Sequence, residues 1–363
     1  MKVMTILGTR PEIIRLSLVI RRLDALCNHV VVNTGQNYDV SLSGVFFDEL
    51  GIRAPNHELR ARGSFGEQIG TILAGAERVM RSERPDRLLV LGDTNSSLAA
   101  IMATRLGIPV YHMEAGNRCH DDTVPEETNR RIIDHLSTVL LPYTERSRQN
   151  LLREGIPGDR IYMTGNPICE VLKHFEASIE SSQVHRRLGV RAHEYFLATL
   201  HRSETVDDDQ RLADVVRSLQ AAHAQYGHPV LWSVHPHTRN RLAALNIDED
   251  GLDGVACVEP QGLFDFVALE RRARCVLTDS GTVQEECAIL RVPSVTLRDV
   301  TERPETIEAG SNMLAGVQPE DVLRAMNVVL ATPPDWEPPA GYLDEDVAAT
   351  VVKIVLGGAA ASR

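Results

Sequence analysis

TDSGTVQEE, residues 278–286, joins an apolar run to a helical pattern whose first turns carry Gln284. The apolar run predicts a buried strand, and the small residues Ser280, Gly281 and Thr282 predict a tight turn before the helix. Such a turn offers backbone N–H groups and the positive end of a helix dipole to an anion, and small side chains let a phosphate approach closely. The stretch therefore predicts an α/β fold with a phosphate seat at this turn. An ordinary strand-to-helix turn is the alternative.

Two charged residues near the turn could complete a nucleotide site. Glu286 lies two turns into the predicted helix, where its carboxylate could hold a ribose diol. Arg303, in the segment Thr301-Glu302-Arg303-Pro304-Glu305, could add positive charge to a diphosphate. The hypothesis is that a nucleotide binds here and that the first half of the chain brings chemistry to it.

The chain is long enough, at 363 residues, for two α/β domains that each have a core. We expect two Rossmann-like, doubly wound domains that face each other across a cleft, because domain interfaces are favoured ligand sites. The first should cover residues 1–166 and the second residues 167–343. A last amphipathic helix within residues 344–363 is expected to pack back on the first domain.

Composition excludes several classes of function. The formal net charge is −12 and there is no dense run of Lys or Arg, which argues against a nucleic-acid or anionic-membrane partner. No apolar run is long enough to span a bilayer, and the N-terminus does not read as a signal peptide. The six cysteines are scattered without metal-ligand spacing, so we expect reduced thiols, no metal and a cytoplasmic protein.

Charged residues follow the predicted strands of the first half. Arg10 follows residues 3–7, Asp93 follows residues 87–91, and Glu114 follows residues 109–113. Because the carboxyl ends of parallel strands share one edge of a sheet, these residues should converge there. Glu126, at a proline-led helix start, is expected to join them. Three carboxylates in one place can supply the acid and base of a proton-transfer reaction.

Each of these residues also has a simpler interpretation. Asp93 could be the N-cap of the next helix, and Glu126 could serve only to stabilise a helix dipole. Arg15 lies on the helix that begins at Pro11 and could point to the same edge, or it could be a solvated surface arginine.

Histidines follow two predicted strands of the second half. His201-Arg202 follows residues 195–200 and suits a pyrophosphate or a leaving-group oxygen. His235-Pro236-His237 follows residues 230–234, and no carboxylate is placed to complete a metal site with the two histidines. Phe266 could line a base pocket, with core packing as the alternative.

Together these segments resemble the non-hydrolysing UDP-N-acetylglucosamine 2-epimerases. The resemblance spans nearly the whole chain, and the set in this order is highly specific. Its motifs are Gly8-Thr9-Arg10-Pro11-Glu12, Thr34-Gly35-Gln36, Gly92-Asp93-Thr94, His112-Met113-Glu114-Ala115-Gly116, Pro125-Glu126-Glu127-Thr128-Asn129-Arg130, Thr164-Gly165-Asn166-Pro167, His201-Arg202, Asp279-Ser280-Gly281 and Thr301-Glu302-Arg303-Pro304-Glu305.

The resemblance implies a glycosyltransferase-B-like fold, a cytoplasmic homodimer, a UDP-sugar substrate and no cofactor or metal. It implies elimination of UDP to a 2-acetamidoglucal and re-addition with a proton on the opposite face of C2. Proton transfer and cation stabilisation would fall to Asp93, Glu114 and Glu126, assisted by His201. The implied UDP-binding residues are Arg10, Arg15, Arg202, His235, Phe266, Ser280, Gly281, Thr282, Glu286 and Arg303.

Some positions depart from the family pattern. Arg15 replaces a usual lysine, and Ser203 stands where a second arginine is common. The loop Asn37-Tyr38-Asp39 argues against the activation by a second UDP-N-acetylglucosamine that well-known bacterial members have. The segments at residues 116–119 and 124–127 look more like the branch that acts on 6-deoxy or uronate UDP-sugars. A hydrolysing epimerase, a glycosyltransferase and a UDP-sugar-binding sensor without activity are the remaining alternatives.

Overall fold

The computed structural model describes residues 1–35 and 46–357 as two compact units. Unit 1 comprises Met1–His174 with Ala340–Arg363, and unit 2 comprises Phe175–Pro339. The loop residues Asn37, Tyr38 and Asp39 lie outside the described residues. Within the described part, no helix has both the length and the apolarity needed to cross a membrane.

Unit 1 is built on a six-stranded parallel sheet in the order β3-β2-β1-β4-β5-β6. The strand order reverses between β1 and β4, which makes the carboxyl ends of these strands the expected ligand site of the sheet. The strands are β1 Lys2–Leu7, β2 Asn28–Asn33, β3 His57–Glu58, β4 Arg87–Leu91, β5 Val110–Met113 and β6 Val139–Leu141.

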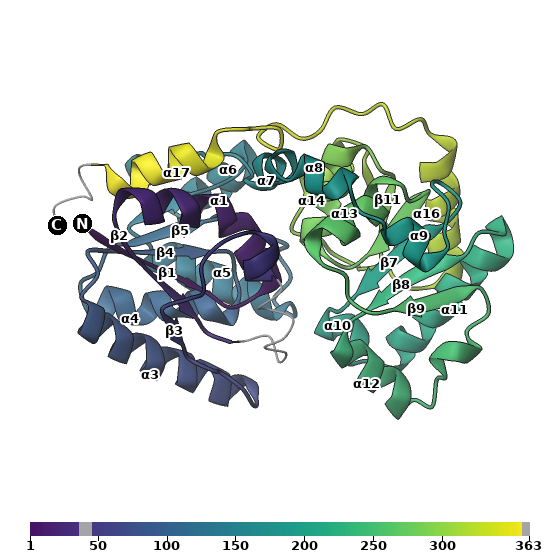
Figure 1. Ribbon diagram of the computed structural model, residues 1–363, viewed down its shortest axis with the longest axis horizontal. Coiled ribbons are helices and arrows are strands. Elements are labelled where there is room, and N and C mark those ends of the chain that lie inside the picture. Colours follow the sequence, from purple (N-terminus) through teal and green to yellow (C-terminus); the bar gives the residue numbers. More distant parts are fainter. Residues whose placement is uncertain (36–45, 358–363) are drawn as a thin grey trace. The chain divides into compact units, whose positions relative to one another are not determined.

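Helices cover this sheet and include one from the far end of the sequence. Helix α17 packs against α1 (Figure 1). Arg87 at the start of β4 donates to the backbone oxygens of Val355 and Gly357. The helices of unit 1 are α1 Arg10–Leu26, α3 Phe65–Glu83, η1 Asn95–Ala99, α4 Ala100–Arg105, α5 Pro125–Leu136, α6 Glu145–Arg153, η2 Gly158–Arg160, α7 Ile168–His174 and α17 Val347–Leu356.

Unit 2 repeats the topology with a second six-stranded parallel sheet, in the order β12-β11-β10-β7-β8-β9. Its reversal point lies between β7 and β10. The strands are β7 Phe196–Leu200, β8 Val230–Val234, β9 Val255–Val258, β10 Cys275–Thr278, β11 Ser294–Thr296 and β12 Asn312–Leu314. The helices are α8 Glu176–Glu180, α9 Val184–Leu188, α10 Ser203–Val206, α11 Asp209–Tyr226, α12 Pro236–Ala244, η3 Glu249–Gly251, α13 Leu263–Arg271, α14 Gly281–Leu290, α15 Pro304–Glu308 and α16 Pro319–Ala331.

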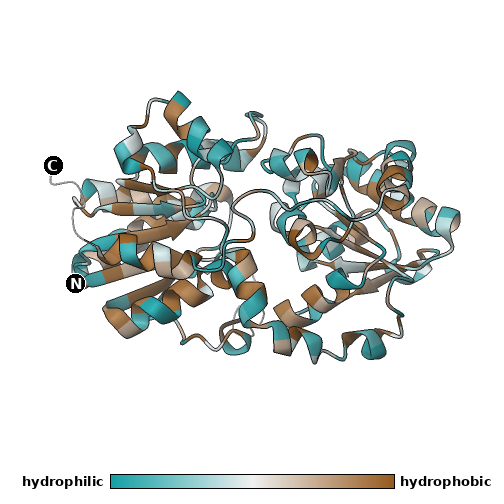
Figure 2. Cartoon of the chain, turned by 90° about the horizontal axis from the view of Figure 1, so that it is seen from above, coloured by the Kyte–Doolittle hydropathy of each residue, from teal (hydrophilic) through white to brown (hydrophobic). Residues whose placement is uncertain are grey.

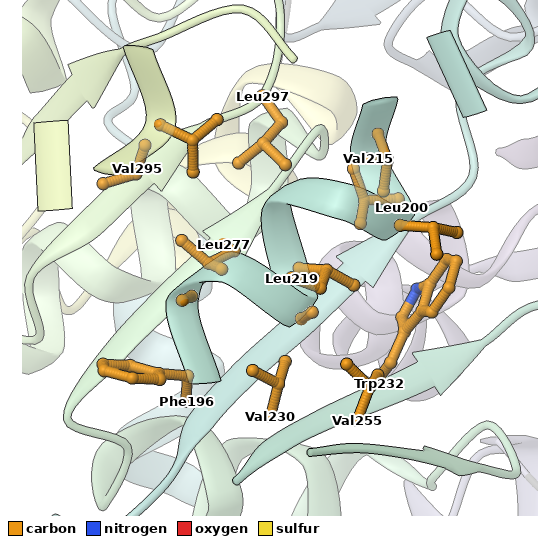
Figure 3. Packing of buried hydrophobic residues seen from close by; sticks show 14 of the residues in the cluster. Phe196, Leu200, Val215, Leu219, Val230, Trp232, Val255, Leu277, Val295 and Leu297 are labelled. Carbon is orange, nitrogen blue, oxygen red and sulfur yellow. The ribbon is translucent and has the colours of Figure 1, made fainter. Parts of the chain in front are cut away.

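Apolar strands make the core of each unit, and hydrophobic colour is concentrated on the strands and on one side of many helices in Figure 2. In unit 2, Trp232 of β8 and Phe196 of β7 pack with Leu219 of α11 and Leu277 of β10 (Figure 3). Because helices cover both faces of a parallel sheet, its central strands are largely apolar along their length. This continuous apolar pattern is the reason that the strands were predictable.

The prediction of two Rossmann-like, doubly wound domains is confirmed. The apolar residues Ile161–Met163 also predict a strand, and this prediction is wrong. Ile161 forms an isolated bridge with Leu140 as the chain leaves η2, and Tyr162 and Met163 are 46% and 52% exposed. Their side chains therefore lack the burial that a strand inside a parallel sheet requires.

Candidate active site

In unit 1, a buried carboxylate joins the two loops at the point where the strand order reverses. Glu12, in the first turn of α1, accepts hydrogen bonds from the backbone nitrogens of Gly8 (2.9 Å) and Thr9 (2.8 Å). Its other oxygen accepts from the Thr94 hydroxyl at 2.9 Å. Burial raises the pKa of Glu12 to about 7, although these hydrogen bonds act in the opposite direction. The loop after β1 is thereby tied to the loop after β4.

Asp93 lies on the loop after β4 and is held by helix α5. Its carboxylate forms an ion pair with Arg130 (2.6 Å), and its backbone oxygen accepts from the side chain of Asn129 (2.9 Å). The N-cap of the following helix η1 is Thr94, so the interpretation of Asp93 as that cap is wrong. The Asp93 side chain is about one-fifth exposed, so it is held by its partners and remains accessible.

Glu114 follows the last residue of β5 with a left-handed backbone, φ 65°. This conformation costs a non-glycine residue about 1 kcal/mol and has to be held by neighbours. Arg15 of α1 forms a 2.5 Å ion pair with the Glu114 carboxylate, and the two side chains are only 2% and 8% exposed. Asn117 donates to the other carboxylate oxygen at 3.3 Å, and Tyr143 lies 3.4 Å from the first. Arg15 is therefore buried against Glu114 rather than solvated.

Glu126 and Glu127 occupy the first turn of α5 in different environments. Glu127 is fully buried and accepts from Arg130 (2.9 Å) and from the Cys119 backbone (3.1 Å). Burial opposes its ionisation, but these hydrogen bonds outweigh burial and keep the pKa of Glu127 below its usual value. Glu126 is half-buried beside it, on the helix that also supplies Arg130 to Asp93.

Arg10 begins helix α1 at the carboxyl end of β1. Its guanidinium lies 4.8 Å from the centre of the Phe46 ring, within the range of a cation–π contact. Unit 1 therefore brings Arg10, Arg15, Asp93, Glu114 and Glu126 to the ends of β1, β4 and β5, or to helix starts next to them.

In unit 2, Asp279 joins the loops at the reversal point. One oxygen of this fully buried carboxylate accepts from the backbone nitrogens of His201 (2.9 Å) and Arg202 (2.8 Å). The other oxygen lies 3.4 Å from Nδ1 of His201. Asp279 follows β10 and the histidine follows β7, so the interaction fixes the His201-Arg202 loop beside the start of α14.

Small residues and one carboxylate surround the start of α14. The hydroxyls of Ser280 and Thr282 are 2.9 Å apart. A Cβ on Gly281 would lie only 2.5 Å from Oε1 of Glu302, so a larger residue here would have to displace that carboxylate. The Glu302 carboxylate forms ion pairs with the guanidinium groups of Arg202 (3.2 Å) and Arg298 (2.8 Å). Both arginines therefore place positive charge near this helix start.

Glu286 and Arg303 complete this part of unit 2. Glu286 is buried in the second turn of α14. The Arg303 Nε pairs with Glu285, and its Nη1 donates to the Glu302 backbone oxygen at 3.3 Å. The predicted phosphate-binding site thus contains Ser280, Gly281, Thr282 and Arg303 around the start of α14, and Glu286 lies one turn further along the helix.

His235 and Phe266 lie on neighbouring elements of unit 2. His235 follows β8 and accepts a 3.2 Å hydrogen bond from the His237 backbone nitrogen, which caps α12. The rings of His201 and His235 are 6.5 Å apart. Phe266 is buried on α13. Residues 1–35 and 46–357 contain no group of His, Cys, Asp and Glu arranged to hold a metal ion.

The sequence predictions did not include several residues that organise the two sites. Glu12, Asp279 and Glu302 stand inside the quoted motifs. For Glu12 and Asp279 the available signal was a carboxylate near a glycine turn, and Glu302 had no such signal. Arg130 and Arg298 have local partners in Glu127 and Glu302. Their pairs with Asp93 and Glu204 depend on the tertiary fold, so no local pattern predicts them.

The chain is similar to known proteins over most of its length. A family model described as UDP-N-acetylglucosamine 2-epimerase matches residues 21–356. The UDP-N-acetylglucosamine 2-epimerase of Methanocaldococcus jannaschii is 40% identical over 349 residues, which are 94% of this chain and 95% of that protein. The crystal structure of a Methanocaldococcus jannaschii UDP-GlcNAc 2-epimerase with UDP-GlcNAc and UDP has a TM-score of 0.94 at 39% identity, covering 99% and 100% of the two chains. The UDP-2,3-diacetamido-2,3-dideoxy-D-glucuronate 2-epimerase of Pseudomonas aeruginosa is 34% identical over 337 residues, 91% and 92% of the two chains.

Proposed function

Because this chain belongs to the UDP-N-acetylglucosamine 2-epimerase family of isomerases, we propose that it interconverts UDP-N-acetylglucosamine and UDP-N-acetylmannosamine. The observation that carries the proposal is the 40% identity to a relative of that name over 94% of this chain. The similar crystal structure that contains UDP-GlcNAc and UDP supports the choice of substrate.

The proposed reaction is an elimination followed by a re-addition. A base removes the proton from C2 while the C1–O bond breaks, and the electron pair of that bond leaves with UDP. A C1–C2 double bond forms, giving 2-acetamidoglucal. UDP then adds back to C1 as a proton is delivered to the opposite face of C2. The hydrogen on C2 is hardly acidic, so C1–O cleavage leads and an oxocarbenium-like state needs negative charge nearby.

Unit 2 supplies the groups suited to the leaving diphosphate. The backbone N–H groups at the start of α14 and the hydroxyls of Ser280 and Thr282 can donate to phosphate oxygens. Arg202 and Arg303 add positive charge at the same helix start, and Glu286 is placed one turn further for a ribose diol. His201, fixed by Asp279, can assist at the leaving oxygen.

Unit 1 supplies the carboxylates that the proposal requires. Inversion at C2 needs one group to remove a proton and a second to deliver one from the other face. Asp93 and Glu114 are candidates because separate arginines, Arg130 and Arg15, stabilise their charges on neighbouring strand ends. Glu126 is the third candidate, at the start of the helix that supplies Arg130.

Turnover in D₂O tests the reaction and the substrate together. The purified protein is offered UDP-N-acetylglucosamine, and C2 is followed by NMR. We expect UDP-N-acetylmannosamine that carries deuterium at C2. Product without deuterium would exclude proton removal at C2, and stoichiometric release of UDP with free N-acetylmannosamine would identify a hydrolysing epimerase instead.

A modified UDP-sugar is the second candidate substrate. It is favoured by the 34% identity to the Pseudomonas aeruginosa relative whose name specifies a diacetamido uronate. Comparing kcat/KM for UDP-N-acetylglucosamine, the 6-deoxy sugar and the uronate decides between them. A value for the uronate that exceeds the other two by an order of magnitude or more would make it the substrate.

A further inference from the structure

His112 of β5 has a buried partner at each ring nitrogen. Nδ1 lies 2.8 Å from Oδ1 of Asp134, and Nε2 lies 2.9 Å from the backbone oxygen of Gly92. A carbonyl oxygen can only accept a hydrogen bond, and an ionised carboxylate can only accept. Both ring nitrogens must therefore carry a proton if Asp134 is ionised, which makes the ring an imidazolium.

The surroundings of Asp134 favour its ionised form. Its second oxygen accepts from the Gly116 backbone nitrogen at 3.1 Å and forms an ion pair with Arg118 at 2.8 Å. Burial opposes ionisation, but the hydrogen bonds and charges of His112 and Arg118 outweigh it and hold the pKa of Asp134 below its usual value. Arg118 also pairs at 2.6 Å with Glu154, the residue that follows α6. With a charged His112, these two cations and two carboxylates form a neutral cluster.

This cluster touches the two loops that carry candidate catalytic carboxylates. Gly92, whose oxygen accepts from His112, directly precedes Asp93. Gly116, whose nitrogen donates to Asp134, is two residues after Glu114. Glu114 has a left-handed backbone, with φ of 65°, which a non-glycine residue keeps only where surrounding interactions hold it. Gly92 has a φ of 71°, which glycine adopts without strain.

We propose that His112 is a positioning residue: a buried imidazolium that links the Gly92 oxygen to Asp134 and so fixes the loops of Asp93 and Glu114 relative to each other. Its effect on turnover rests on the proposed function. Its charge state and its hydrogen bonds do not depend on that function, so they can be tested separately.

Unit 1 contains a second histidine–aspartate pair that serves as a matched control. His29 of β2 lies 2.7 Å from Oδ1 of Asp24 through Nδ1, and 2.8 Å from the Thr5 hydroxyl through Nε2. A hydroxyl can donate as well as accept, so His29 can be neutral with both nitrogens satisfied. Burial lowers the pKa of His29, in agreement with a neutral ring. His29 is also buried but touches neither carboxylate loop.

The kinetic test compares His112→Asn with His29→Asn. Loss of positioning should lower kcat of His112→Asn by about 10- to 100-fold while KM changes less than about threefold, since the UDP-binding groups of unit 2 are unaltered. His29→Asn should keep kcat within about twofold at a similar loss of thermal stability. A folded His112→Asn protein with wild-type kcat would overturn the inference, as would an equal loss of kcat in both variants. Asp134→Asn, which removes the same link from its other side, should lower kcat in the same way and provides a second folded variant.

The charge state is tested without substrate by NMR of protein labelled with ¹⁵N-histidine. Because Asp134 and the Gly92 oxygen both accept, we expect both ring nitrogens of His112 to carry a proton in the wild-type protein and the second proton to be lost in Asp134→Asn. His29 should show one protonated and one unprotonated nitrogen. A neutral His112 ring beside wild-type Asp134 would overturn the inference. If the wild-type protein turns over none of the UDP-sugars, the proposed function fails, and this spectrum still decides the charge state of His112.

Discussion

At the scale of single residues, the Arg15–Glu114 ion pair is a buried contact whose loss should lower the stability of the protein. Both side chains are almost fully buried, with 2.5 Å between the charged atoms. Removing one partner of a buried pair leaves the other charge without compensation and typically costs about 3–5 kcal/mol. We therefore expect Arg15→Met to lower the free energy of unfolding by about 3 kcal/mol, measured by urea titration, and to lower kcat/KM as Glu114 is released.

An exposed pair of unit 1 provides the control for this substitution. Arg81 pairs with Glu77 at 2.8 Å on α3, and the arginine side chain is 64% exposed. Arg81→Met should change the free energy of unfolding by less than about 1 kcal/mol, because water and salt already screen such a pair. Equal losses in the two variants would contradict a special role for burial of Arg15.

Gly281 is the residue whose enlargement should most directly weaken binding of UDP. A Cβ there would lie 2.5 Å from Glu302, and that carboxylate is held by Arg202 and Arg298. We expect Gly281→Ala to raise the Kd for UDP about tenfold, which corresponds to about 1.4 kcal/mol, as measured by calorimetry.

Gly70 on α3 is the matched glycine. Nothing lies within 4 Å of a Cβ at this exposed position, so Gly70→Ala should raise the free energy of unfolding by about 0.5–1 kcal/mol through helix propensity. Its Kd for UDP should not change. An unchanged Kd in Gly281→Ala as well would remove this helix start from the proposed UDP site.

The sequence predicted that residues at strand ends would gather, but it could not predict their contacts. Alternation along the strand from His112 places Glu114 on the same face, yet the strand ends at Met113 and the backbone of Glu114 turns left-handed. Arg15 is separated from Glu114 by 99 residues and Asp134 from His112 by 22. No local pattern connects such partners, because they are defined by which strands become neighbours.

At the scale of elements, the junction between β1 and α1 should give unit 1 a pH-dependent stability. Burial raises the pKa of Glu12 from 4.5 to about 7, so the folded state keeps a proton that the unfolded state has already lost between these values. The contribution of Glu12 to the free energy of unfolding is fully present below pH 4.5 and is lost as the pH rises toward 7. A shift of this size corresponds to about 3 kcal/mol.

Glu12→Gln isolates this effect because glutamine does not titrate. Urea titrations at pH 4.5 and pH 7 give the free energy of unfolding of the wild type and of Glu12→Gln. Between these pH values the wild type should lose about 3 kcal/mol relative to Glu12→Gln. A difference that is independent of pH would mean that Glu12 is ionised in the folded state over this whole range.

Elements that are buried on both faces were the ones that the sequence located best. The predicted strands at residues 87–91 and 230–234 match β4 and β8 to the residue, because a parallel strand that is buried on both faces is a largely apolar run. The short strands β3 and β12 were not predicted. Each has two or three residues and includes polar side chains, so its pairing depends on the neighbouring strand rather than on its own pattern.

At the scale of the whole molecule, both tryptophans report on unit 2. The chain has two, and Trp232 and Trp336 both lie within Phe175–Pro339. Trp232 is fully buried in the core, and Trp336 donates to the Ala288 backbone oxygen on α14 at 3.0 Å. Tryptophan fluorescence therefore follows unfolding of the unit that contains the proposed UDP seat, whereas far-UV circular dichroism follows the helices of both units.

Because both tryptophans lie in unit 2, the location of UDP binding can be tested in the intact protein. If UDP binds through the α14 start, a concentration of 100 times Kd should stabilise the fluorescence-detected transition by about 2.7 kcal/mol. Gly281→Ala should reduce that gain at the same UDP concentration, whereas Gly70→Ala should retain it. If UDP stabilises only the unfolding transition detected by circular dichroism and leaves the transition detected by tryptophan fluorescence unchanged, nucleotide binding belongs to unit 1. The carboxylates of unit 1 would then have to share their strand ends with a diphosphate, and their like charges would oppose binding.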